Sequence, residues 1–383
     1  MRQAPDLLVV GAGALGLSVA WRCARRGMSV HVVDRGEPGA GATAASAGVL
    51  TPTEPREWTG ALGAFNRSAL QAWPAFADEL EDEAGLSAGY ERRGELRLLR
   101  RGSDATFVKA AEAGALAFGL PHERLSEEDL LGLEPGLSLG SCALLLSEAA
   151  AVHTAELTRA LSEACTRAGA QFGMGEEVLE LAASGGAVTA HLAGGQTLEA
   201  GRAVVSAGAW SGSLLGHDAP PVTPVLGESV VLRMGPVPPC RLVVRSADGA
   251  VVPRRDGTLW MGTTLEEKGF VDAPRAGAIH DIIANAAAFL PAVAELAFLT
   301  AHAGLRPGTP DGLPIVGASP LSGVALATGH GREGIMHAPL TAGLLAEALE
   351  KGRWPAELEP FAPSRFTGPG RGGRTLGATG DGA

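Results

Sequence analysis

The sequence contains little cysteine and fewer basic than acidic residues. Only four of its 383 residues are cysteines, and none of them forms a CxxC pair or shows the spacing of zinc ligands. They are Cys23, Cys142, Cys165 and Cys240. This pattern excludes a disulfide-built domain and a zinc module, and it indicates reduced thiols, with Cys23 in a core. The net charge of −11 disfavours nucleic acid or an anionic membrane as the main partner.

Long apolar runs are also missing. No stretch approaches the roughly 18 apolar residues that a membrane span needs, and the first apolar strand begins by Leu7 without a signal-peptide cleavage region. We therefore expect a cytoplasmic protein with no membrane span. Hydrophobic residues make up 46% and charged residues 19% of the chain, which is typical of soluble globular proteins. A chain of this length is expected to form two or three domain-sized units.

Glycine, by contrast, is abundant, and it first gathers in a βαβ pattern. The apolar run Leu7–Val10 predicts a buried parallel strand, and the apolar spacing after it predicts a helix. A second apolar strand ends in Asp34. The turn between the first strand and the helix contains Gly11, Gly13 and Gly16, which is the spacing of a dinucleotide-binding turn.

Each of these glycines has a physical task in such a turn. Gly11 permits the tight turn, Gly13 lets the backbone approach a pyrophosphate, and Gly16 lets helix and strand pack closely. Asp34 lies 18 residues after Gly16, close to the roughly 20 expected for a ribose-binding carboxylate. The alternative is a tight βα turn without a ligand. Because the strand, the helix, the second strand and the acidic end all agree, we predict a dinucleotide site.

The rest of the chain alternates between helical and extended patterns. The stretch GEPGAGATAASAGVLTP, residues 36–52, is nearly all small residues and predicts a backbone that lies close to a flat or charged group. Helices are predicted at Ala69–Glu83, at Thr154–Ala168 with Thr154 as N-cap, and at Ala276–Phe289. Short runs predict a β-meander from Val178 to Leu198 and antiparallel strands from Val222 to Thr264. A strand, a Gly-rich turn and a helix closed by Gly352 follow.

The stretch GLRPGTPDGLPIVG, from Gly304 to Gly317, carries a single arginine. Seven of its fourteen residues are glycine or proline, which predicts a stiff loop rather than a helix or a strand. Arg306 stands in it between a leucine and a proline. A lone guanidinium on a mostly apolar loop indicates a fixed anion partner.

The order of these elements differs from that of a nicotinamide dehydrogenase, which usually continues βαβα around one sheet. The sequence instead resembles the FAD-dependent D-amino acid oxidase superfamily, and within it the glycine oxidases of thiamine biosynthesis. The resemblance runs from about Leu7 to Phe361. It rests on the motifs VVGAGALGLSVAW, ATAASAGVL, AELTRALSEACTRAGA, VVSAGAWS, PVLGE, VVPRRDG, AGLRPGTPDGLPIVG and ATGHGREGI, in this order.

This resemblance implies an α/β fold with two interleaved domains. A Rossmann-like FAD-binding domain with a β-meander would comprise residues 1–80, 141–215 and 300–365. An antiparallel-sheet substrate domain would comprise residues 81–140 and 216–299. The Gly-rich residues 366–383 are expected to form a disordered tail.

The resemblance also implies which residues hold FAD. They are Gly11, Gly13, Ala14, Leu15, Gly16, Asp34, Arg35, Ala42, Thr43, Ala47, Gly48, Val49, Val178, His330, Gly331, Arg332, Glu333, Gly334, Ile335 and Met336. Asp34 and Arg35 would lie at the adenosine ribose, Val178 at the adenine, and residues 330–336 around the flavin. Non-covalent FAD is expected, because the cysteine that holds flavin in monomeric sarcosine oxidases would fall near Gly304–Leu305, where no cysteine occurs.

Arg306, Arg332 and Ala250 would form the substrate site. In the family, the position of Arg306 binds the substrate carboxylate, which a guanidinium can clamp with two hydrogen bonds. The position of Arg332 lies beside it and could instead serve the flavin or Glu333. Ala250 stands where matching glycine oxidases carry a tyrosine whose hydroxyl helps to hold the carboxylate. Either the single tyrosine, Tyr90, reaches in, or carboxylate binding is weaker, or the substrate is larger than glycine.

The implied reaction is the oxidation of a small amino acid or secondary amine, such as glycine, sarcosine or a D-amino acid. Flavin takes a hydride from the α-carbon, and the resulting imine hydrolyses to a keto acid. No catalytic side chain and no metal is expected, and oxygen is the expected electron acceptor, giving hydrogen peroxide. The alternatives are a dehydrogenase that uses an electron carrier, a flavoprotein subunit of a hetero-complex or scaffold, and a nicotinamide dehydrogenase. A homo-oligomer stays open.

Overall fold

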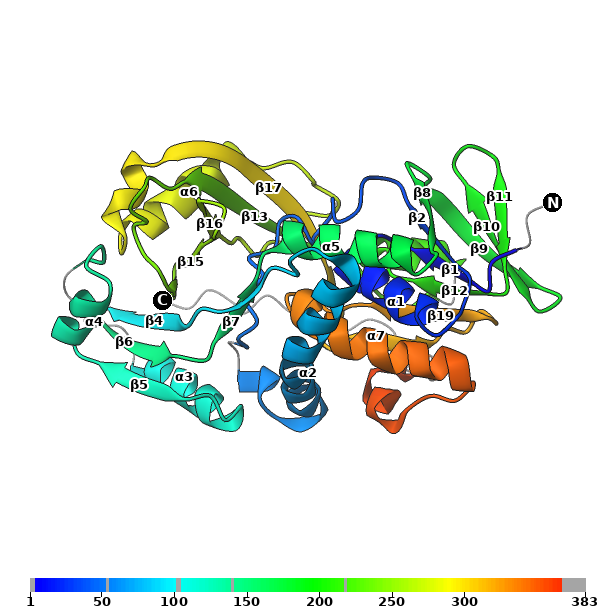
Figure 1. Ribbon diagram of the computed structural model, residues 1–383, viewed down its shortest axis with the longest axis horizontal. Coiled ribbons are helices and arrows are strands. Elements are labelled where there is room, and N and C mark those ends of the chain that lie inside the picture. The colour runs from blue at the N-terminus through cyan, green and yellow to red at the C-terminus, as the bar shows by residue number, and fades with distance from the viewer. Residues whose placement is uncertain (1–3, 53–54, 101–104, 139–140, 217–218, 367–383) are drawn as a thin grey trace, which may run out of the picture.

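The computed structural model describes residues 4–52, 55–100, 105–138, 141–216 and 219–366. The predicted tail lies, from residue 367 onward, outside the described residues. Figure 1 shows two halves side by side, a helix-covered parallel sheet at one end and a long, mainly antiparallel sheet at the other. The chain crosses between the halves several times, so both are discontinuous in sequence. Within the described ranges, no helix is long and apolar enough to cross a lipid bilayer.

The first half is built on a mostly parallel sheet. Its strands are short and apolar, as expected for a sheet that is covered on both faces. In spatial order they are β18 (Ile315–Ala318), β19 (Val324–Thr328), β12 (Arg202–Val205), β1 (Leu7–Val10), β2 (Val30–Asp34) and β8 (Gln171–Met174). Only the pairing of β18 with β19 is antiparallel in this described sheet. The predicted βαβ unit is confirmed by the parallel pairing of β1 and β2.

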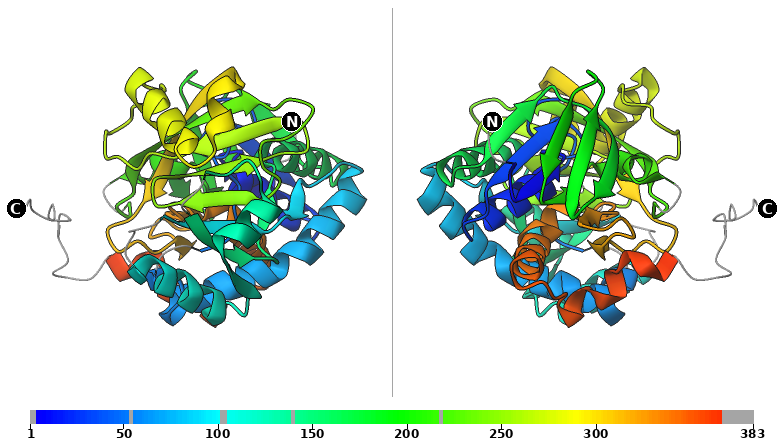
Figure 2. Two further views of the ribbon diagram at one scale, coloured as in Figure 1. Left: turned by 90° about the vertical axis from the view of Figure 1, so that its left-hand side faces the viewer. Right: turned by 90° about the vertical axis from the view of Figure 1, so that its right-hand side faces the viewer.

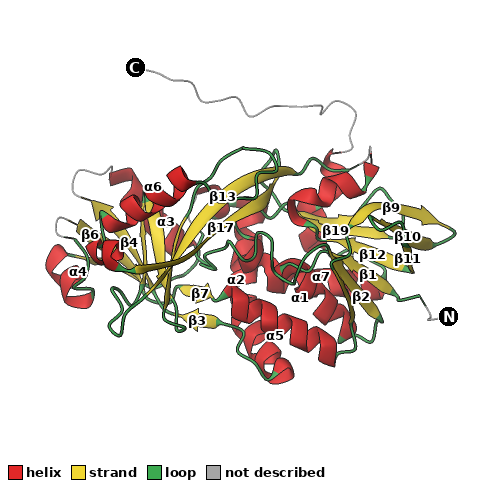
Figure 3. Cartoon of the chain, turned by 90° about the horizontal axis from the view of Figure 1, so that it is seen from above, coloured by secondary structure: helices red, strands yellow, loops and turns green. Residues whose placement is uncertain are grey.

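Helices cover one face of this sheet and the β-meander covers the other (Figures 2 and 3). The helices are α1 (Ala14–Ala24), α2 (Gly60–Ala84), α5 (Thr154–Arg167) and α7 (Gly334–Lys351). The meander consists of β9 (Val178–Ser184), β10 (Ala187–Leu192) and β11 (Thr197–Ala200). Alternate residues of β1 divide between the two layers: Leu7 and Val9 pack with the helices, whereas Leu8 and Val10 pack with the meander.

The second half is built on a long sheet. Its strand order is β17 (Ala297–Gly308), β13 (Thr223–Arg233), β16 (Thr258–Gly262), β15 (Gly249–Pro253), β14 (Val243–Ser246), β4 (Glu95–Arg100), β6 (Ser141–Leu146) and β5 (His122–Leu125). All described pairings are antiparallel except that of β14 with β4. The helices α3 (Ala105–Ala117), α4 (Glu127–Leu133) and α6 (Ala276–Ala287) pack on it. β6 and β17 both belong to this sheet. The sheet therefore extends beyond the ranges expected for the substrate domain, residues 81–140 and 216–299, because β6 and most of β17 lie outside them.

Short elements connect the two halves. A two-stranded pairing of β3 (Tyr90–Arg92) with β7 (Ala150–Val152) lies between them. An isolated bridge from Val49 to Ala151 joins the small-residue segment to β7. Short 3-10 helices cover Pro55–Glu57, Gly208–Leu214, Pro291–Glu295, Ala356–Phe361 and Pro363–Phe366.

Two helix predictions need correction. Helix α5 begins at Thr154, but the side chain that caps it is His153, whose Nδ1 accepts a hydrogen bond from Glu156 N at 3.4 Å. Thr154 is buried in the helix itself, so its hydroxyl is not at the cap position. Helix α2 begins at Gly60 rather than near Ala69, because the apolar spacing continues upstream through buried side chains.

The segment that contains Arg306 is a strand rather than a loop. β17 extends to Gly308 and pairs with β13 in a ladder that includes Val225 opposite Arg306 and Pro224 opposite Pro307. Because β17 is the edge strand of the sheet, it can carry Pro307 without losing a central hydrogen bond. The predicted loop is therefore confined to the residues between Gly308 and the start of β18 at Ile315.

Candidate active site

A cavity of about 860 Å³ lies between the two sheets. Twenty of the predicted site residues line it, and they come from the first βα turn, the small-residue segment, the meander, the long sheet and the start of α7. They are Gly11, Gly13, Ala14, Leu15, Asp34, Arg35, Ala42, Thr43, Ala47, Gly48, Val49, Val178, Ala250, Arg306, His330, Gly331, Arg332, Glu333, Gly334 and Ile335. Segments far apart in the sequence thus share one cavity.

Gly16 and Met336 do not line this cavity. A Cβ at Gly16 would overlap the Gly11 carbonyl oxygen and the Ser206 hydroxyl, so this glycine allows helix α1 to pack on the strands. Met336 is 1% exposed in the helix layer, and its carbonyl accepts a hydrogen bond from Trp73 Nε1 at 3.0 Å. Both residues shape the cavity through their neighbours.

The first βα turn presents bare backbone to the cavity. Gly11 has a φ of +107°, and a Cβ there would overlap the Ser206 backbone. Gly13 differs, because a Cβ there would meet only the Thr43 hydroxyl, at 3.4 Å. The open side of Gly13 therefore leaves room for a group to lie directly on the turn.

Two helix N-termini face the cavity. Gly13 is the N-cap of α1 and Glu333 is the N-cap of α7, and in the described chain neither supplies a side-chain cap. Neither helix has an acidic residue in its first turn. Ala14 N donates to the Thr43 hydroxyl at 3.1 Å. The remaining first-turn N–H groups and the positive end of the helix dipole favour negative charge. The arrangement suits a pyrophosphate at α1 and an electron-rich ring system at α7.

Asp34 holds the adenosine end of the predicted site together. Its two carboxylate oxygens accept hydrogen bonds from Ala12 N at 2.7 Å and from Gly36 N at 2.9 Å. Arg35 beside it places its guanidinium 3.7 Å from the centre of the Trp210 ring. Together with the open glycine turn and the two helix ends, this end of the cavity fits a dinucleotide such as FAD.

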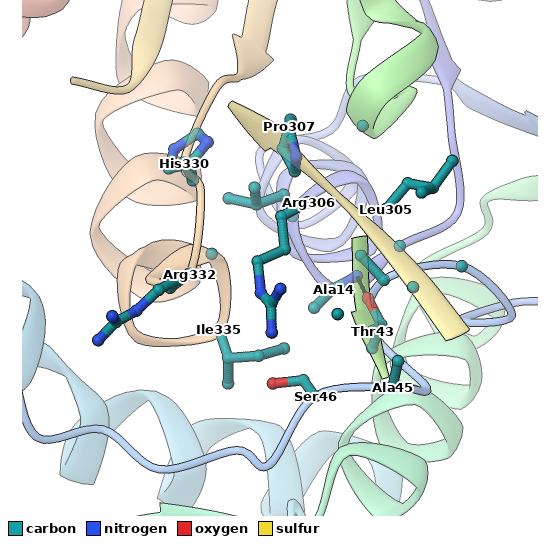
Figure 4. Close-up of a pocket in the computed structure, with 18 of the residues that line it drawn as sticks. Ala14, Thr43, Ala45, Ser46, Leu305, Arg306, Pro307, His330, Arg332 and Ile335 are labelled. Carbon is teal, nitrogen blue, oxygen red and sulfur yellow. Dashed lines mark hydrogen bonds between the residues drawn. The ribbon is translucent and has the colours of Figure 1, made fainter. Parts of the chain in front are cut away.

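Arg306 extends from β17 into the other end of the cavity. Figure 4 shows its side chain pointing into the space between Ile335 and Ala14. Its Nη1 donates to the Leu226 and Thr264 carbonyl oxygens at 3.2 and 3.1 Å, and its Nη2 donates to the Thr263 hydroxyl. Among the described residues, no carboxylate forms an ion pair with it. The guanidinium is held rigidly and its charge is not neutralised by a direct ion pair.

The glycine of PVLGE explains how this guanidinium fits. Gly227 lies in β13 next to Arg306, and a Cβ there would overlap the guanidinium group. Burial and, to a smaller extent, the nearby Arg332 guanidinium lower the pKa of Arg306 to about 10, although the Glu333 carboxylate acts in the opposite direction. Arg306 is still a cation at neutral pH. A bound anion would compensate both the lost hydration of the guanidinium and its repulsion by Arg332.

Ala250 lines the cavity from β15, and its neighbour across the sheet is a residue that the sequence interpretation missed. Arg245 in β14 pairs directly with Ala250 and also lines the cavity. The available signal was the alternation of β14, in which the charged Arg245 shares a face with the apolar Val243. Gly227 and Thr263, which hold Arg306, were missed as well.

Tyr90 does not reach the cavity. Its ring stacks on Trp73 in the helix layer, with the ring centres 5.8 Å apart and the planes 6° from parallel. It is not among the residues that line the cavity. The expectation that Tyr90 replaces the missing tyrosine hydroxyl is therefore wrong, because β3 pairs with β7 and places the ring against Trp73.

Two buried histidines lie behind the start of α7. His330 Nε2 lies 3.2 Å from the Thr341 hydroxyl, and His337 Nε2 lies 2.6 Å from Asn66 Oδ1. Burial lowers the pKa of His330 to about 3 and that of His337 well below its usual range. Burial therefore favours the neutral form of both imidazoles in the folded protein.

This burial predicts a loss of stability in acid. Below pH 6.5 the unfolded chain binds a proton at His330 and the folded chain does not, so the free energy of unfolding falls between pH 6.5 and 3. The slope from this residue is up to about 1.4 kcal/mol per pH unit. Denaturant unfolding between pH 7.5 and 5 should show a shallower slope for His330→Gln. Replacement of the exposed His280 should leave the slope unchanged, and equal slopes for all three proteins would contradict the prediction.

Comparisons with known proteins agree with this site. Residues 6–348 match the family model DAO, described as FAD dependent oxidoreductase. The glycine oxidase of Pseudomonas aeruginosa is 33% identical over 365 residues, which cover 94% of this chain and 98% of that protein. The crystal structure of glycine oxidase from Geobacillus kaustophilus matches with a TM-score of 0.87 and 28% identity, covering 95% of this chain and 99% of that one.

A solved structure with a different substrate in its name is also similar. Iminodiacetate oxidase from Chelativorans matches with a TM-score of 0.83 and 25% identity, over 93% of this chain and 98% of that one. The fold expected from the sequence is confirmed by these matches. FAD is the cofactor of the family, and the cavity has the open turn and the helix ends that FAD requires. The chain therefore belongs to the DAO family of FAD-dependent oxidoreductases.

Proposed function

We propose that the protein oxidises a small amino acid or secondary amine to an imine, which water converts to a keto acid, with oxygen as the electron acceptor. The observation that carries the proposal is the Arg306 guanidinium, which is partly buried, lacks a carboxylate partner among the described residues and points into the cavity beside α7. A carboxylate-bearing substrate would supply that partner. The likeness to amine oxidases in both comparisons supports the same chemistry.

In this proposal the residues of the chain bind and orient the substrate. Arg306 clamps the carboxylate, which fixes the direction of the bond from the α-carbon to its hydrogen. The predicted cofactor residues that line the cavity hold FAD, and Arg332 lies beside both groups. When bound, FAD supplies the electron acceptor for the oxidation. The walls of the cavity keep water away from the reacting carbon, and no dedicated base is needed if the amine binds in its neutral form.

The pathway depends on the substrate. The resemblance to glycine oxidases implies a role in thiamine biosynthesis, and this role requires that glycine be a substrate. The absence of a tyrosine at Ala250 favours larger amines, because it removes a hydroxyl and adds the space of a phenol ring. The cytoplasm as the place of the reaction remains part of the proposal.

Anaerobic mixing of the purified yellow protein with a panel of amines tests the proposal. Bleaching of the flavin by glycine, sarcosine or a D-amino acid is the expected result, and lack of bleaching by every amine would contradict it. Admission of air should then restore the colour and release hydrogen peroxide in equal amount. Reoxidation only by a quinone or another carrier would instead identify a dehydrogenase.

Ala250→Tyr is expected to shift the substrate preference toward glycine. The new hydroxyl could add up to about 1.5 kcal/mol of binding if it reaches the carboxylate, and the ring would occupy the space beside Arg245. Steady-state kcat/KM for glycine, sarcosine and D-alanine should be compared in both proteins. Ala250→Leu is the control, since it fills similar space without a hydroxyl. If the unaltered protein already prefers glycine, the larger-substrate interpretation of Ala250 is wrong.

A further inference from the structure

A second arginine faces the cavity beside Ala250. Arg245 and Ala250 are directly opposite each other in the antiparallel pair β14–β15, so their side chains share one face of the sheet. That face is the one that borders the cavity, and both residues line it. The small Ala250 side chain leaves the space next to the guanidinium open.

The carboxylate beside Arg245 is shared with a second guanidinium and does not neutralise both. Glu95 Oε1 lies 3.2 Å from Arg245 Nε and also accepts a hydrogen bond from Arg97 Nε at 2.9 Å. Arg245 Nε therefore forms an ion pair with Glu95 without the geometry of a hydrogen bond, and the Arg245 side chain is 19% exposed. Two guanidiniums therefore share one fully buried carboxylate, which leaves this group with a net positive charge.

The charge of Arg245 adds to that of the carboxylate clamp. Burial lowers the pKa of Arg245, and the guanidiniums of Arg97 and Arg332 lower it as well. Arg332 also lowers the pKa of Arg306. The Glu333 carboxylate acts in the opposite direction on both arginines, so Arg306 and Arg245 share Arg332 and Glu333 as charged neighbours.

The two arginines flank Ala250. On one side Ala250 pairs with Arg245, and on the other side it pairs with Gly262 of β16. The residue after Gly262 is Thr263, whose hydroxyl accepts from Arg306. A substrate that occupies the space above Ala250 would therefore have one guanidinium at each end. Each could bind its own carboxylate.

We propose that Arg245 binds a second carboxylate of the substrate, and that the preferred substrates are dicarboxylic. This inference rests on the proposed function, because Arg306 takes the carboxylate next to the oxidised carbon. The class includes D-aspartate, D-glutamate and amines that carry two carboxymethyl groups on nitrogen, such as iminodiacetate. Arg245 is a specificity-determining residue and takes no part in the oxidation itself.

An acidic residue near the same strand provides the competing reading. Asp248 lies in the turn between β14 and β15 and also lines the cavity. If Asp248 rather than Arg245 faced the substrate, the enzyme would prefer a basic side chain. D-lysine therefore belongs in the substrate panel, and a preference for it would overturn the proposal.

Steady-state kinetics of Arg245→Met test the proposal on the FAD-loaded protein. The unaltered protein should have a higher kcat/KM for D-aspartate and iminodiacetate than for sarcosine, D-alanine and D-lysine. In Arg245→Met, KM for the dicarboxylic substrates should rise roughly ten- to hundredfold, as expected for the loss of a charge-assisted pair. The values for sarcosine and D-alanine should change little. Removal of Arg245 leaves a neutral Glu95–Arg97 pair, which favours folding of the variant.

Two further variants separate charge from structure. Arg245→Lys keeps the charge and should retain part of the dicarboxylate preference. Arg241→Met removes an exposed arginine just before the same strand and should change no ratio between substrates. An unchanged ratio in Arg245→Met, or an equal loss for all substrates, would overturn the proposal.

A binding measurement provides a readout that does not depend on turnover. Malonate and acetate should be titrated while the flavin absorbance is followed. The unaltered protein should bind malonate more tightly than acetate. Arg245→Met should lower the affinity for malonate roughly ten- to hundredfold and leave the affinity for acetate unchanged. Equal binding of both acids would overturn the inference. If no amine reduced the flavin but malonate binding still required Arg245, the proposed function would fail and the second-carboxylate site would stand.

Discussion

Gly13→Val is expected to give a folded protein that does not retain FAD. The backbone at Gly13 has a φ of −73° and a ψ of 177°, which valine adopts readily, and a Cβ there meets only the Thr43 hydroxyl at 3.4 Å. The added methyl groups would instead occupy the open side of the turn, where the pyrophosphate is proposed to lie. After gel filtration, the flavin absorbance per protein should be near zero, and the circular dichroism should match that of the unaltered protein.

Gly16→Val is the matched control, because it lies on the same turn but faces the protein. A Cβ at Gly16 would overlap the Gly11 carbonyl oxygen and the Ser206 hydroxyl, so this variant should lose folding as well as flavin. A Gly13→Val protein with one flavin per chain would show that the pyrophosphate does not lie on this turn. A Gly16→Val protein of normal stability would contradict the packing argument.

Arg306→Met is expected to lower kcat/KM for every carboxylate-bearing substrate by tens- to several-hundredfold. The loss corresponds to roughly 2–4 kcal/mol of transition-state binding, as for a charge-assisted pair. Arg306→Lys should lose most of the same activity, because its ammonium cannot form two parallel hydrogen bonds. Anaerobic flavin reduction, measured against substrate concentration, separates weaker binding from slower oxidation.

Stability measurements keep this result interpretable. Replacement of Arg306 removes a partly buried cation that repels Arg332 but also the hydrogen bonds to Leu226, Thr263 and Thr264, so the free energy of unfolding should be measured beside kcat/KM. Arg365→Met is the control, since Arg365 pairs with Asp311 away from the cavity and should affect stability more than turnover. Near-normal oxidation of an amino acid by Arg306→Met would remove the carboxylate assignment.

The sequence predicts the cofactor half of the molecule better than the substrate half. The βαβ unit depends on residues within about thirty positions, and its glycines, apolar runs and acidic end are all local signals. Most of the predicted cofactor residues line the cavity in the structure. Their individual contacts with FAD stay predictions, which variants such as Gly13→Val can test.

The substrate half depends on pairing between distant strands. Arg306 seemed to stand on a loop because its neighbours are proline and glycine, yet β13 holds it in a ladder about eighty residues away in sequence. Gly227 gains its role only because Arg306 lies against it. Arg245 becomes a site residue only when β14 and β15 bring it opposite Ala250. Local composition carries no information on such registers.

The position of Arg306 in β17 restricts how this enzyme can change its substrate during evolution. Successive side chains of a strand point to opposite faces, so one inserted or deleted residue in the regular ladder between Thr300 and Arg306 would turn the guanidinium away from the cavity. A loop would tolerate such a change in length. Substrate preference at this wall should therefore diverge through replacements such as those at Ala250 and Arg245, while differences in length accumulate before Ala297 and after Gly308.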